Sequence, residues 1–467
     1  MISLTLREIA TTLGGRLAAT TAGDDTAVGG SVQTDSRLVT AGSIFFAMPG
    51  EEADGHDFIP QAIANGAALI IAERAVDVSV PTIVVDNGVA ALADLAREIV
   101  ARVRAGGDLR VVAVTGSNGK TTTKNMLRAI LGAQGPTVGP DGSFNNHVGA
   151  PISMLRIDES TRYLVVEMGA SHTGEIAHLV SIARPDVGIV LAVGRAHVGE
   201  FGGIDVIARA KAEMVVELPA DATAILNSDD RRVAAMAGQT AADVSWFGRD
   251  EGSGLRAWNV VSSLAGTSFD LVIDDRIIAV QLRIVGEHHA MNALAALSAA
   301  RVLGVDADEA VAALEAMPRA ERWRMELLTS PAGAVIINDA YNASPESASA
   351  ALHALAAVRP HGSRSVAVLG EMTELGATAE EEHSAIGSLA ARLGIDRLVV
   401  VGPRAMAIHS AVTASDGWIG DADFVQNADD AYLLLDGDLG PDDVVLVKSS
   451  KSANLRFLGD RLAGITQ

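Results

Sequence analysis

One segment, residues 111–123, constrains the fold more than any other part of the chain. An apolar, β-branched run at 111–115 leads into a turn bounded by Gly116 and Gly119, and Lys120 then opens a helical pattern. A strand that enters a helix through such a turn directs backbone N–H groups and the positive end of the helix dipole at an anion. The Lys120 ammonium and the Thr121 hydroxyl would add a phosphate contact and a magnesium ligand. The segment therefore predicts a phosphate-binding loop in a parallel α/β sheet.

The loop departs from the common phosphate-loop pattern in the place of one glycine. That pattern puts a glycine five residues before the Gly-Lys pair, where this chain has Val114, and Gly116 lies closer to the helix instead. We infer a shorter variant of the loop, and a purely structural glycine turn is the alternative. The predicted nucleotide contacts are Thr115, Gly116, Ser117, Asn118, Gly119, Lys120, Thr121 and Thr122.

Length and composition limit the classes of function. A chain of 467 residues is too long for one ordinary core and suggests about three domains. A net charge of −22 argues against a nucleic acid or an anionic membrane as partner. The chain has no cysteine, no secretory signal pattern and no apolar run near the roughly 20 residues of a membrane span. We expect a cytoplasmic protein without membrane insertion, and a monomer, because no heptad run is present.

Alternating strand and helix patterns predict an α/β fold with mostly parallel, doubly wound sheets. We place the domains at 1–107, 108–318 and 319–467, with Gly106 and Gly107 ending a helix at the first boundary and Pro318 marking the second. The predicted strands lie at 44–48, 68–71, 82–85, 111–115, 163–167, 187–193, 222–227, 335–338, 365–369, 397–401 and 444–447, with an antiparallel hairpin at 269–284.

Candidate metal ligands follow the strands of the central domain. Glu167 ends the strand at 163–167, where a carboxylate holds magnesium or is simply solvated. His197 follows the next strand, and its alternatives are a second hard-metal site or a packed residue. Lys211 lies in the predicted helix at 204–216, where the default is a solvated helix face, and an unmodified ammonium would repel magnesium.

Five further residues carry possible substrate chemistry. His289 and Asn292 are spaced to share one helix face, and Asn292 either reads a base edge or caps the helix. Arg324 either reaches a phosphate across a domain cleft or pairs with Glu326. Asp339 and Lys448 end strands of the third domain, and Lys448 could bind a carboxylate.

Strings along nearly the whole chain resemble the Mur ligase family, the ATP-dependent amide-forming enzymes of peptidoglycan precursor synthesis. The loop at 115–121 has the short glycine spacing of this family. The resemblance is closest to the member that joins D-alanyl-D-alanine to UDP-N-acetylmuramoyl-tripeptide, on strings at 34–37, 45–47, 143–151, 339–347 and 369–376. The sister enzyme that adds the third stem-peptide residue carries an Asp-Asn-Pro-Arg type of string, which we do not find.

The resemblance implies a small N-terminal α/β domain for the UDP-sugar substrate, a central ATPase domain and a C-terminal Rossmann-like domain that closes on the amine substrate. Lys120 would bind ATP phosphates, and two Mg²⁺ ions would be held by Thr121, Glu167, His197 and Lys211, the last as a carbamylated lysine whose two oxygens turn repulsion into attraction. Asn292, Arg324 and Asp339 would contact the nucleotide, and Ser36, Arg37 and Asn145 the UDP-sugar peptide. One departure is Lys451, which stands where the family usually has arginine and lacks its bidentate fork.

The implied reaction is amide formation through an acyl phosphate. Two alternatives stay open: the sister ligase, which shares every phosphate and metal residue, and a nucleotide-gated switch that hydrolyses ATP only to change shape. The identity of the tripeptide's third residue is not readable from the sequence.

Overall fold

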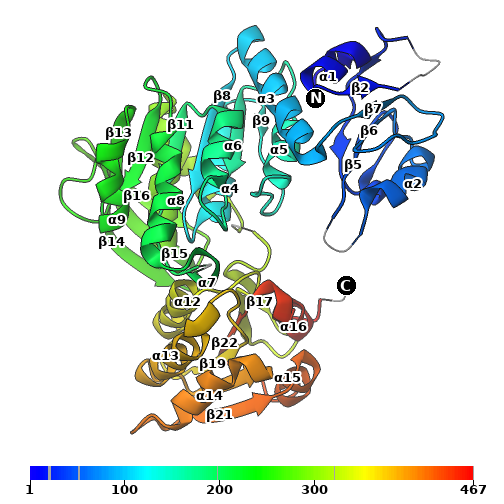
Figure 1. Ribbon diagram of the computed structural model, residues 1–467. Coiled ribbons are helices and arrows are strands. Elements are labelled where there is room, and N and C mark those ends of the chain that lie inside the picture. The colour runs from blue at the N-terminus through cyan, green and yellow to red at the C-terminus, as the bar shows by residue number, and fades with distance from the viewer. Residues whose placement is uncertain (19–22, 51–52, 197, 320, 466–467) are drawn as a thin grey trace.

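The computed structural model describes residues 1–18, 23–50, 53–196, 198–319 and 321–465, which form three α/β units. In Figure 1 the N-terminal unit lies at the upper right, the central unit at the upper left and the C-terminal unit below. His197, predicted as a metal ligand, lies outside the described residues.

The N-terminal unit is built on a five-stranded sheet of order β2-β7-β6-β5-β4. Strands β4 to β7 are parallel and β2 runs antiparallel to β7. Its strands are β1 (Leu4–Thr5), β2 (Arg16–Leu17), β3 (Ala27–Val28), β4 (Val32–Gln33), β5 (Ile44–Ala47), β6 (Leu69–Ala72) and β7 (Thr82–Val84), and its helices are α1 (Leu6–Thr12), α2 (Ile59–Ala64) and α3 (Gly88–Gly106).

The central unit holds a nine-stranded sheet of order β16-β15-β14-β13-β12-β11-β8-β10-β9. The strands from β9 to β14 are parallel, and β14, β15 and β16 form an antiparallel meander that contains the predicted hairpin. The strands are β8 (Arg110–Thr115), β9 (Thr137–Val138), β10 (Tyr163–Glu167), β11 (Val187–Val190), β12 (Thr223–Asn227), β13 (Asp243–Gly248), β14 (Leu255–Ser263), β15 (Gly266–Ile273) and β16 (Arg276–Leu282). The helices are α4 (Lys120–Gln134), α5 (Gly149–Met154), α6 (Glu175–Ala183), α7 (Val198–Phe201), α8 (Ile204–Val216), α9 (Arg231–Ala234), α10 (His288–Val302) and α11 (Ala307–Glu315).

Successive residues of the central strands pack into opposite layers of core. In β8, Val111 and Ala113 face the core under α3, α6 and α8, whereas Val112 and Val114 face the core under α4 and α10. This alternation is the strand period of two, and burial on both faces explains the uninterrupted apolar run. Because α3 also packs on the N-terminal sheet, one continuous core joins the first two units.

The C-terminal unit has a six-stranded sheet of order β17-β18-β22-β19-β20-β21, parallel except for β17. Helices α12 to α14 cover one face and α15 and α16 the other, as the core clusters show. The strands are β17 (Glu326–Thr329), β18 (Val335–Asn338), β19 (Arg364–Leu369), β20 (Arg397–Val401), β21 (Asp421–Val425) and β22 (Asp443–Lys448). The helices are α12 (Pro345–Val358), α13 (Ala379–Arg392), α14 (Met406–Thr413), α15 (Ala428–Leu435) and α16 (Leu455–Leu462).

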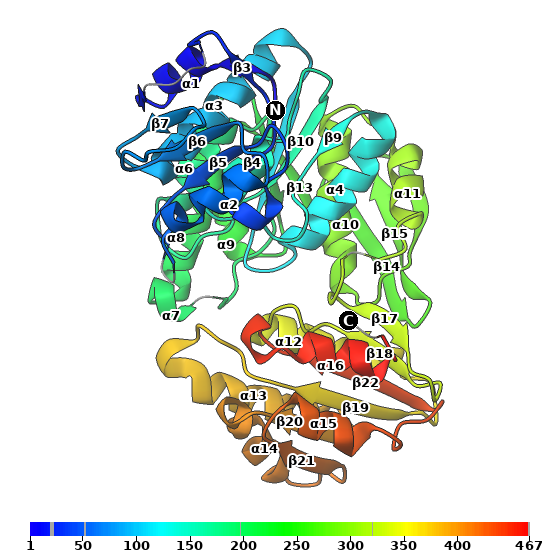
Figure 2. The same cartoon turned by 90° about the vertical axis from the view of Figure 1, so that its right-hand side faces the viewer.

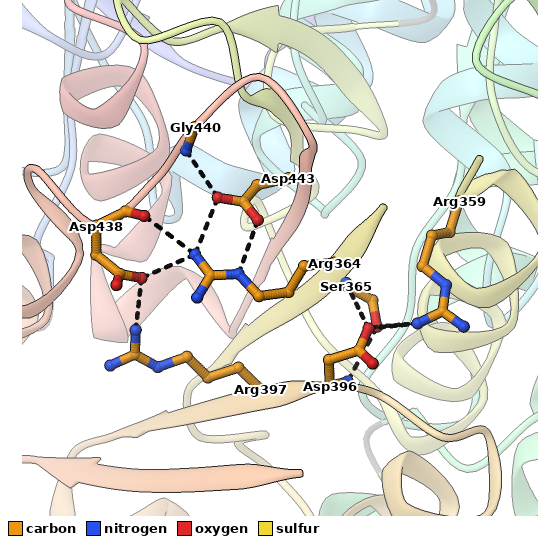
Figure 3. A network of polar contacts seen from close by, with 8 residues as sticks. All are labelled: Arg359, Arg364, Ser365, Asp396, Arg397, Asp438, Gly440 and Asp443. Atoms are coloured by element: carbon orange, nitrogen blue, oxygen red, sulfur yellow. Dashed lines mark hydrogen bonds and ion pairs between the residues drawn. The ribbon is translucent and has the colours of Figure 1, made fainter. Parts of the chain in front are cut away.

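A network of ion pairs closes the amino ends of three neighbouring strands in this sheet (Figure 3). Arg364 at the start of β19 contacts Asp443 at the start of β22 through Nε and Nη2, at 2.7 and 2.9 Å. Asp438 bridges Arg364 and Arg397, at 2.9 and 2.7 Å. In Figure 2 the C-terminal unit lies below the central unit. At the carboxyl end of β22, Lys448 lines a cavity that residues of the central unit also line, as expected because open parallel sheets bind ligands beyond the carboxyl ends of their strands.

No helix among the described residues is both long and apolar enough to cross a membrane.

Candidate active site

A cavity of about 520 Å³ lies where the central and C-terminal units meet. The central unit contributes residues 117–122, Asn145, Glu167, Lys211 and Asn292, and the C-terminal unit contributes Arg324, Asp339 and Lys448. Most of the residues predicted from the sequence thus line one cleft, although they come from positions more than 300 residues apart.

The phosphate loop connects β8 to α4 in a conformation that glycine permits. Gly119 has φ of +86°, and a Cβ added there would meet Asn292 Oδ1 at 2.3 Å. Lys120 Nζ donates to the carbonyl oxygen of Gly116 over 2.7 Å, so the ammonium stays over the loop. Thr115 is fully buried, and within the described part of the chain neither it nor Gly116 lines the cleft.

Ser117 fixes the loop to the segment that follows β11. Its Oγ accepts from the backbone N–H of Gly194 at 2.8 Å and donates to the Gly194 carbonyl at 3.1 Å. The backbone N–H of Ser117 also donates to the Ala192 carbonyl at 2.8 Å. The ends of β8 and β11 therefore form one rigid edge of the cleft.

Glu167 ends β10 beside the loop and is 1% exposed. Its Oε1 accepts from Asn145 Nδ2 at 2.7 Å and from Thr121 Oγ1 at 3.3 Å. Its Oε2 is buried without a hydrogen-bond partner. An unpaired buried carboxylate oxygen is costly, and a divalent cation is the kind of group that would compensate it.

Lys211 projects from α8 into the same cleft and is 4% exposed, so it is not a lysine on a solvated helix face. Burial lowers its pKa to about 7, and the nearby positive charge of Lys120 acts in the same direction. Near neutral pH, a large share of the Lys211 amine is therefore uncharged.

The described residues contain no group of three or more His, Asp or Glu side chains placed to hold a metal. The described members of the predicted set are the Thr121 hydroxyl, the Glu167 carboxylate and the Lys211 amine, each from a different element. This donor set fits a hard cation with oxygen ligands once Lys211 carries a carbamate, because a bare amine supplies no oxygen.

His289 and Asn292 share one face of α10, as their spacing predicts. Asn292 Nδ2 lies 3.3 Å from His289 Nδ1, and His289 Nε2 is buried with no hydrogen-bond partner. Burial, with added repulsion from His288 and Arg324, holds the pKa of His289 well below its usual range. A neutral imidazole and an amide are groups that can hydrogen-bond to a nucleobase.

Arg324 reaches the cleft from the segment before β17. Its guanidinium stacks on the Tyr341 ring, 4.4 Å from the centroid, and its buried Nε has no hydrogen-bond partner. Glu326 pairs instead with Arg319 and Arg322, at 2.9 and 3.0 Å. The alternative reading of Arg324 as the salt-bridge partner of Glu326 is therefore wrong.

Asp339 and the buried Lys448 form an ion pair at the carboxyl ends of β18 and β22. Lys448 Nζ lies 2.8 Å from Asp339 Oδ2 and also donates to the Asn342 carbonyl at 2.8 Å. The Lys448 ammonium is thus already engaged by Asp339, and a ligand carboxylate would have to share it.

Ser36 and Arg37 lie apart from this cleft. They line a second cavity of about 690 Å³ between the N-terminal and central units. Ser36 Oγ donates to Gln61 Oε1 at 2.8 Å, while the exposed Arg37 pairs with Asp35. His147 lines both cavities, so the two sites adjoin.

Several contacts between the units had no signal in the sequence. Ser143 Oγ lies 2.6 Å from Tyr341 Oη, and Ser344 Oγ donates to Asn118 Oδ1 at 3.2 Å. Arg195 pairs with Glu382 at 2.6 Å. Such pairs depend on how two domains dock, so the segments at 115–122, 143–151 and 339–347 contained four of these residues without indicating which of them meet.

Three family models match the chain in order. The Mur ligase family catalytic domain matches residues 30–105, the Mur ligase middle domain 114–300, and the Mur ligase glutamate ligase domain 323–451. A UDP-N-acetylmuramoyl-tripeptide--D-alanyl-D-alanine ligase of Mycobacterium tuberculosis is 43% identical over 99% of this chain and 98% of its own length. This chain belongs to the Mur ligase family.

Other members agree with this Mur ligase in sequence and in structure. The enzyme of the same name from Escherichia coli is 35% identical over 88% of each chain. A crystal structure of MurF from Acinetobacter baumannii superposes with a TM-score of 0.88 at 30% identity, covering 99% of both chains. MurF from Thermotoga maritima in complex with ADP gives a TM-score of 0.81 at 30% identity over 93% of this chain and 97% of its own. The three-domain Mur ligase architecture expected from the sequence is thereby confirmed.

Proposed function

We propose that this Mur ligase joins D-alanyl-D-alanine to UDP-N-acetylmuramoyl-tripeptide at the expense of ATP, giving the UDP-sugar pentapeptide precursor of peptidoglycan. The observation that carries the proposal is the buried Glu167 carboxylate, which lies beside the phosphate loop, contacts Thr121 and Asn145, and has one unpaired oxygen. The names of the relatives that match almost the whole chain support this choice of substrates.

Each unit has a main task in this proposal. Residues 1–107 hold the UDP-sugar through Ser36 and Arg37, residues 108–318 hold ATP, and residues 319–467 bring the amine substrate. Because the cavities share His147, the peptide end of the UDP-sugar can extend from its own cavity toward the phosphate loop.

The reaction has two bond exchanges. A carboxylate oxygen of the tripeptide attacks the γ-phosphorus of ATP, and the bond to ADP breaks, which leaves an acyl phosphate. The amine nitrogen of D-alanyl-D-alanine then attacks the activated carbonyl carbon, phosphate leaves and a proton is released. Lys120 and Arg324 offset the phosphate charge, and catalysis is mainly positioning and electrostatic stabilisation.

Residues 117–122 would cradle the ATP phosphates, with Asn292, Arg324 and Asp339 around the rest of the nucleotide. Thr121 and Glu167 would hold one Mg²⁺, and His197 with a carbamylated Lys211 would serve a second. The neutral amine of Lys211 is the form that adds carbon dioxide, and its lowered pKa of about 7 supports that modification. Magnesium bound there would neutralise the charge of the transferring phosphoryl group.

Water must be kept out of the cleft because an acyl phosphate hydrolyses readily. The bridges from Ser143 to Tyr341 and from Asn118 to Ser344 hold the C-terminal unit over the phosphate loop. Closure of that unit would sequester the activated carbonyl until the amine attacks.

One assay tests the proposal against its alternatives. The enzyme is supplied with UDP-N-acetylmuramoyl-tripeptide, ATP and D-alanyl-D-alanine, and phosphate and the UDP-sugar pentapeptide are measured together. Equal yields of both products are expected. Phosphate without pentapeptide would favour an ATPase switch. A parallel reaction supplies UDP-N-acetylmuramoyl-dipeptide with a single amino acid, and product from that reaction alone would indicate the sister ligase. Supplying lysine- and diaminopimelate-containing tripeptides separately identifies the third residue.

A further inference from the structure

Helix α4 carries a second buried lysine, one turn after the phosphate-loop lysine. Lys124 is 0% exposed, and its Nζ donates to the carbonyl oxygens of Pro140 and Gly142 at 2.8 and 2.7 Å. Lys120 and Thr121 line the cleft, whereas Lys124 is not among the described residues that do so. Its ammonium is therefore bound by the loop between β9 and α5 and does not line the cleft.

Burying this ammonium costs free energy, and its hydrogen bonds to two carbonyl oxygens offset part of that cost. Burial lowers the pKa of Lys124 to about 8, although Glu167 and Glu321 act in the opposite direction. Even a buried ion pair can often be replaced by well-packed apolar residues without loss of stability, so burial of a charge is not by itself evidence for a stabilising role. The hydrogen bonds from Lys124 to Pro140 and Gly142 end on a stretch with no helix or strand of its own, so they determine where that stretch lies.

The same stretch carries two contacts of the cleft directly after the lysine's acceptors. Ser143 Oγ lies 2.6 Å from Tyr341 Oη of the C-terminal unit. Asn145 donates from Nδ2 to Glu167 Oε1 at 2.7 Å, and its carbonyl accepts from Gly169 N–H at 2.8 Å. Lys124 thus holds the base of a loop whose tip orients the Glu167 carboxylate.

We propose that Lys124 is a positioning residue for the ligase reaction: by tying residues 140–142 to α4, it sets Asn145 against Glu167 and Ser143 against Tyr341. Lys124 then fixes the positions of three groups relative to one another, because all three depend on α4. They are the phosphate loop, the Glu167 carboxylate and the contact between Ser143 and Tyr341. The inference rests on the proposed function of the cleft, since it assigns Lys124 a part in the same reaction.

Arg128 provides a matched control on the next turn of α4. Its Nη1 reaches the same Pro140 carbonyl at 3.3 Å and the exposed Asp141 at 3.4 Å, but its side chain is 35% exposed. Arg128→Met removes a cation that contacts the same loop from its solvent side, while Lys124 still holds Pro140 and Gly142. We therefore expect near wild-type kinetics from Arg128→Met.

The test compares Lys124→Met with Arg128→Met in kcat, in KM for each substrate and in ADP affinity by calorimetry. For Lys124→Met, we expect kcat/KM for the UDP-sugar tripeptide to fall about 10- to 100-fold, the usual loss when a group that orients a ligand is removed. The dissociation constant of ADP should stay within about twofold, because the phosphate loop itself is intact.

A double-mutant cycle with Asn145→Ala tests whether Lys124 affects activity through Asn145. If Lys124 acts through Asn145, the alanine substitution costs much less in the Lys124→Met background than in the wild type. Three results would each overturn the inference: additive losses in the cycle, wild-type kinetics in Lys124→Met, and an ADP affinity that falls in step with activity. A Lys124→Met variant that fails to fold would overturn it too, because the lysine would then be structural. Absence of pentapeptide product from the wild-type enzyme would instead be a failure of the proposed function.

Discussion

Asn145 donates a 2.7 Å hydrogen bond to Oε1 of Glu167, while Oε2 of the same carboxylate is buried without any hydrogen-bond partner. The Asn145 amide fixes the orientation of the Glu167 carboxylate. Its second oxygen is left without a partner, and a bound cation would supply one. This pairing joins a loop at 139–148 to the end of β10, and it makes Glu167 the group on which magnesium binding should depend most.

Glu167→Gln keeps the shape of the side chain but removes its charge. We expect kcat to fall at least about 100-fold, as is usual when a preorganised electrostatic contact to a transferring group is lost. The magnesium concentration for half-maximal activity should rise as well. A magnesium titration of phosphate release, together with calorimetry of ADP binding with and without magnesium, measures both. An unchanged magnesium requirement would remove Glu167 from the metal site.

Lys211→Ala should abolish activity and regain part of it when a short carboxylic acid such as formate is added. The acid would restore the two oxygens that the carbamate supplies in the cavity left by the side chain. Lys120→Ala is the matched control, because it loses a positive charge that no carboxylic acid can replace and should not be rescued. Full activity of Lys211→Ala without additive would contradict a role for this lysine.

The buried parallel strands were predictable because burial on both faces leaves an uninterrupted apolar run. The strands at 163–167, 335–338 and 397–401 and the helix at 204–216 match β10, β18, β20 and α8 at both ends. The short edge strand β21 was not predicted, because a strand partly open to water, with the sequence Asp-Ala-Asp-Phe-Val, lacks that signal.

The site was predictable where its residues follow strands and not where two units meet. The Glu167 position follows from strand order, because the carboxyl ends of parallel strands share one edge. The pairing of Lys448 with Asp339, 109 residues away, and the stacking of Arg324 on Tyr341 depend on tertiary packing. Sequence patterns report local periodicity and carry no information about such distant partners.

Gly199 in α7 is in direct contact with the C-terminal unit. Its N–H donates to the Glu374 carbonyl at 2.9 Å, and a Cβ there would lie 2.6 Å from the backbone nitrogen of Gly376. Gly199→Ala should therefore push the two units apart and lower kcat about 10- to 100-fold, because small misplacements between reacting groups are costly. Steady-state kinetics and small-angle scattering with bound nucleotide measure the two effects.

Gly132→Ala is the control for that substitution. A Cβ at Gly132, inside α4, meets nothing within 4 Å, and alanine is favoured over glycine in a helix by about 0.5–1 kcal/mol. Its kcat and scattering profile should match the wild type. A Gly199→Ala enzyme with the same kcat as Gly132→Ala would show that this contact does not matter for turnover.

Arg364→Met should destabilise the C-terminal sheet at neutral pH without changing the chemistry of the cleft. Arg364 is 35% exposed and Asp443 6% exposed, so the variant takes the arginine away from a nearly buried carboxylate that keeps the Gly440 N–H as a donor, at an expected cost of about 1–3 kcal/mol. Arg276→Met, which breaks the exposed pair with Asp308, should change stability little. Urea unfolding of both variants measures the difference.

The same pair predicts a pH dependence of definite sign. Burial tends to raise the pKa of Asp443, but hydrogen bonds from Arg364 and from the Gly440 N–H outweigh it, so the pKa lies below its ordinary value. A carboxylate with a lowered pKa in the folded protein stabilises it above the unfolded pKa of about 4, and that contribution is lost as pH falls through the folded value. The difference in unfolding free energy between wild type and Arg364→Met should therefore be largest near pH 7 and shrink below about pH 4. A difference that stays constant down to pH 3 would mean that Arg364 stabilises the sheet by packing and not by its charge.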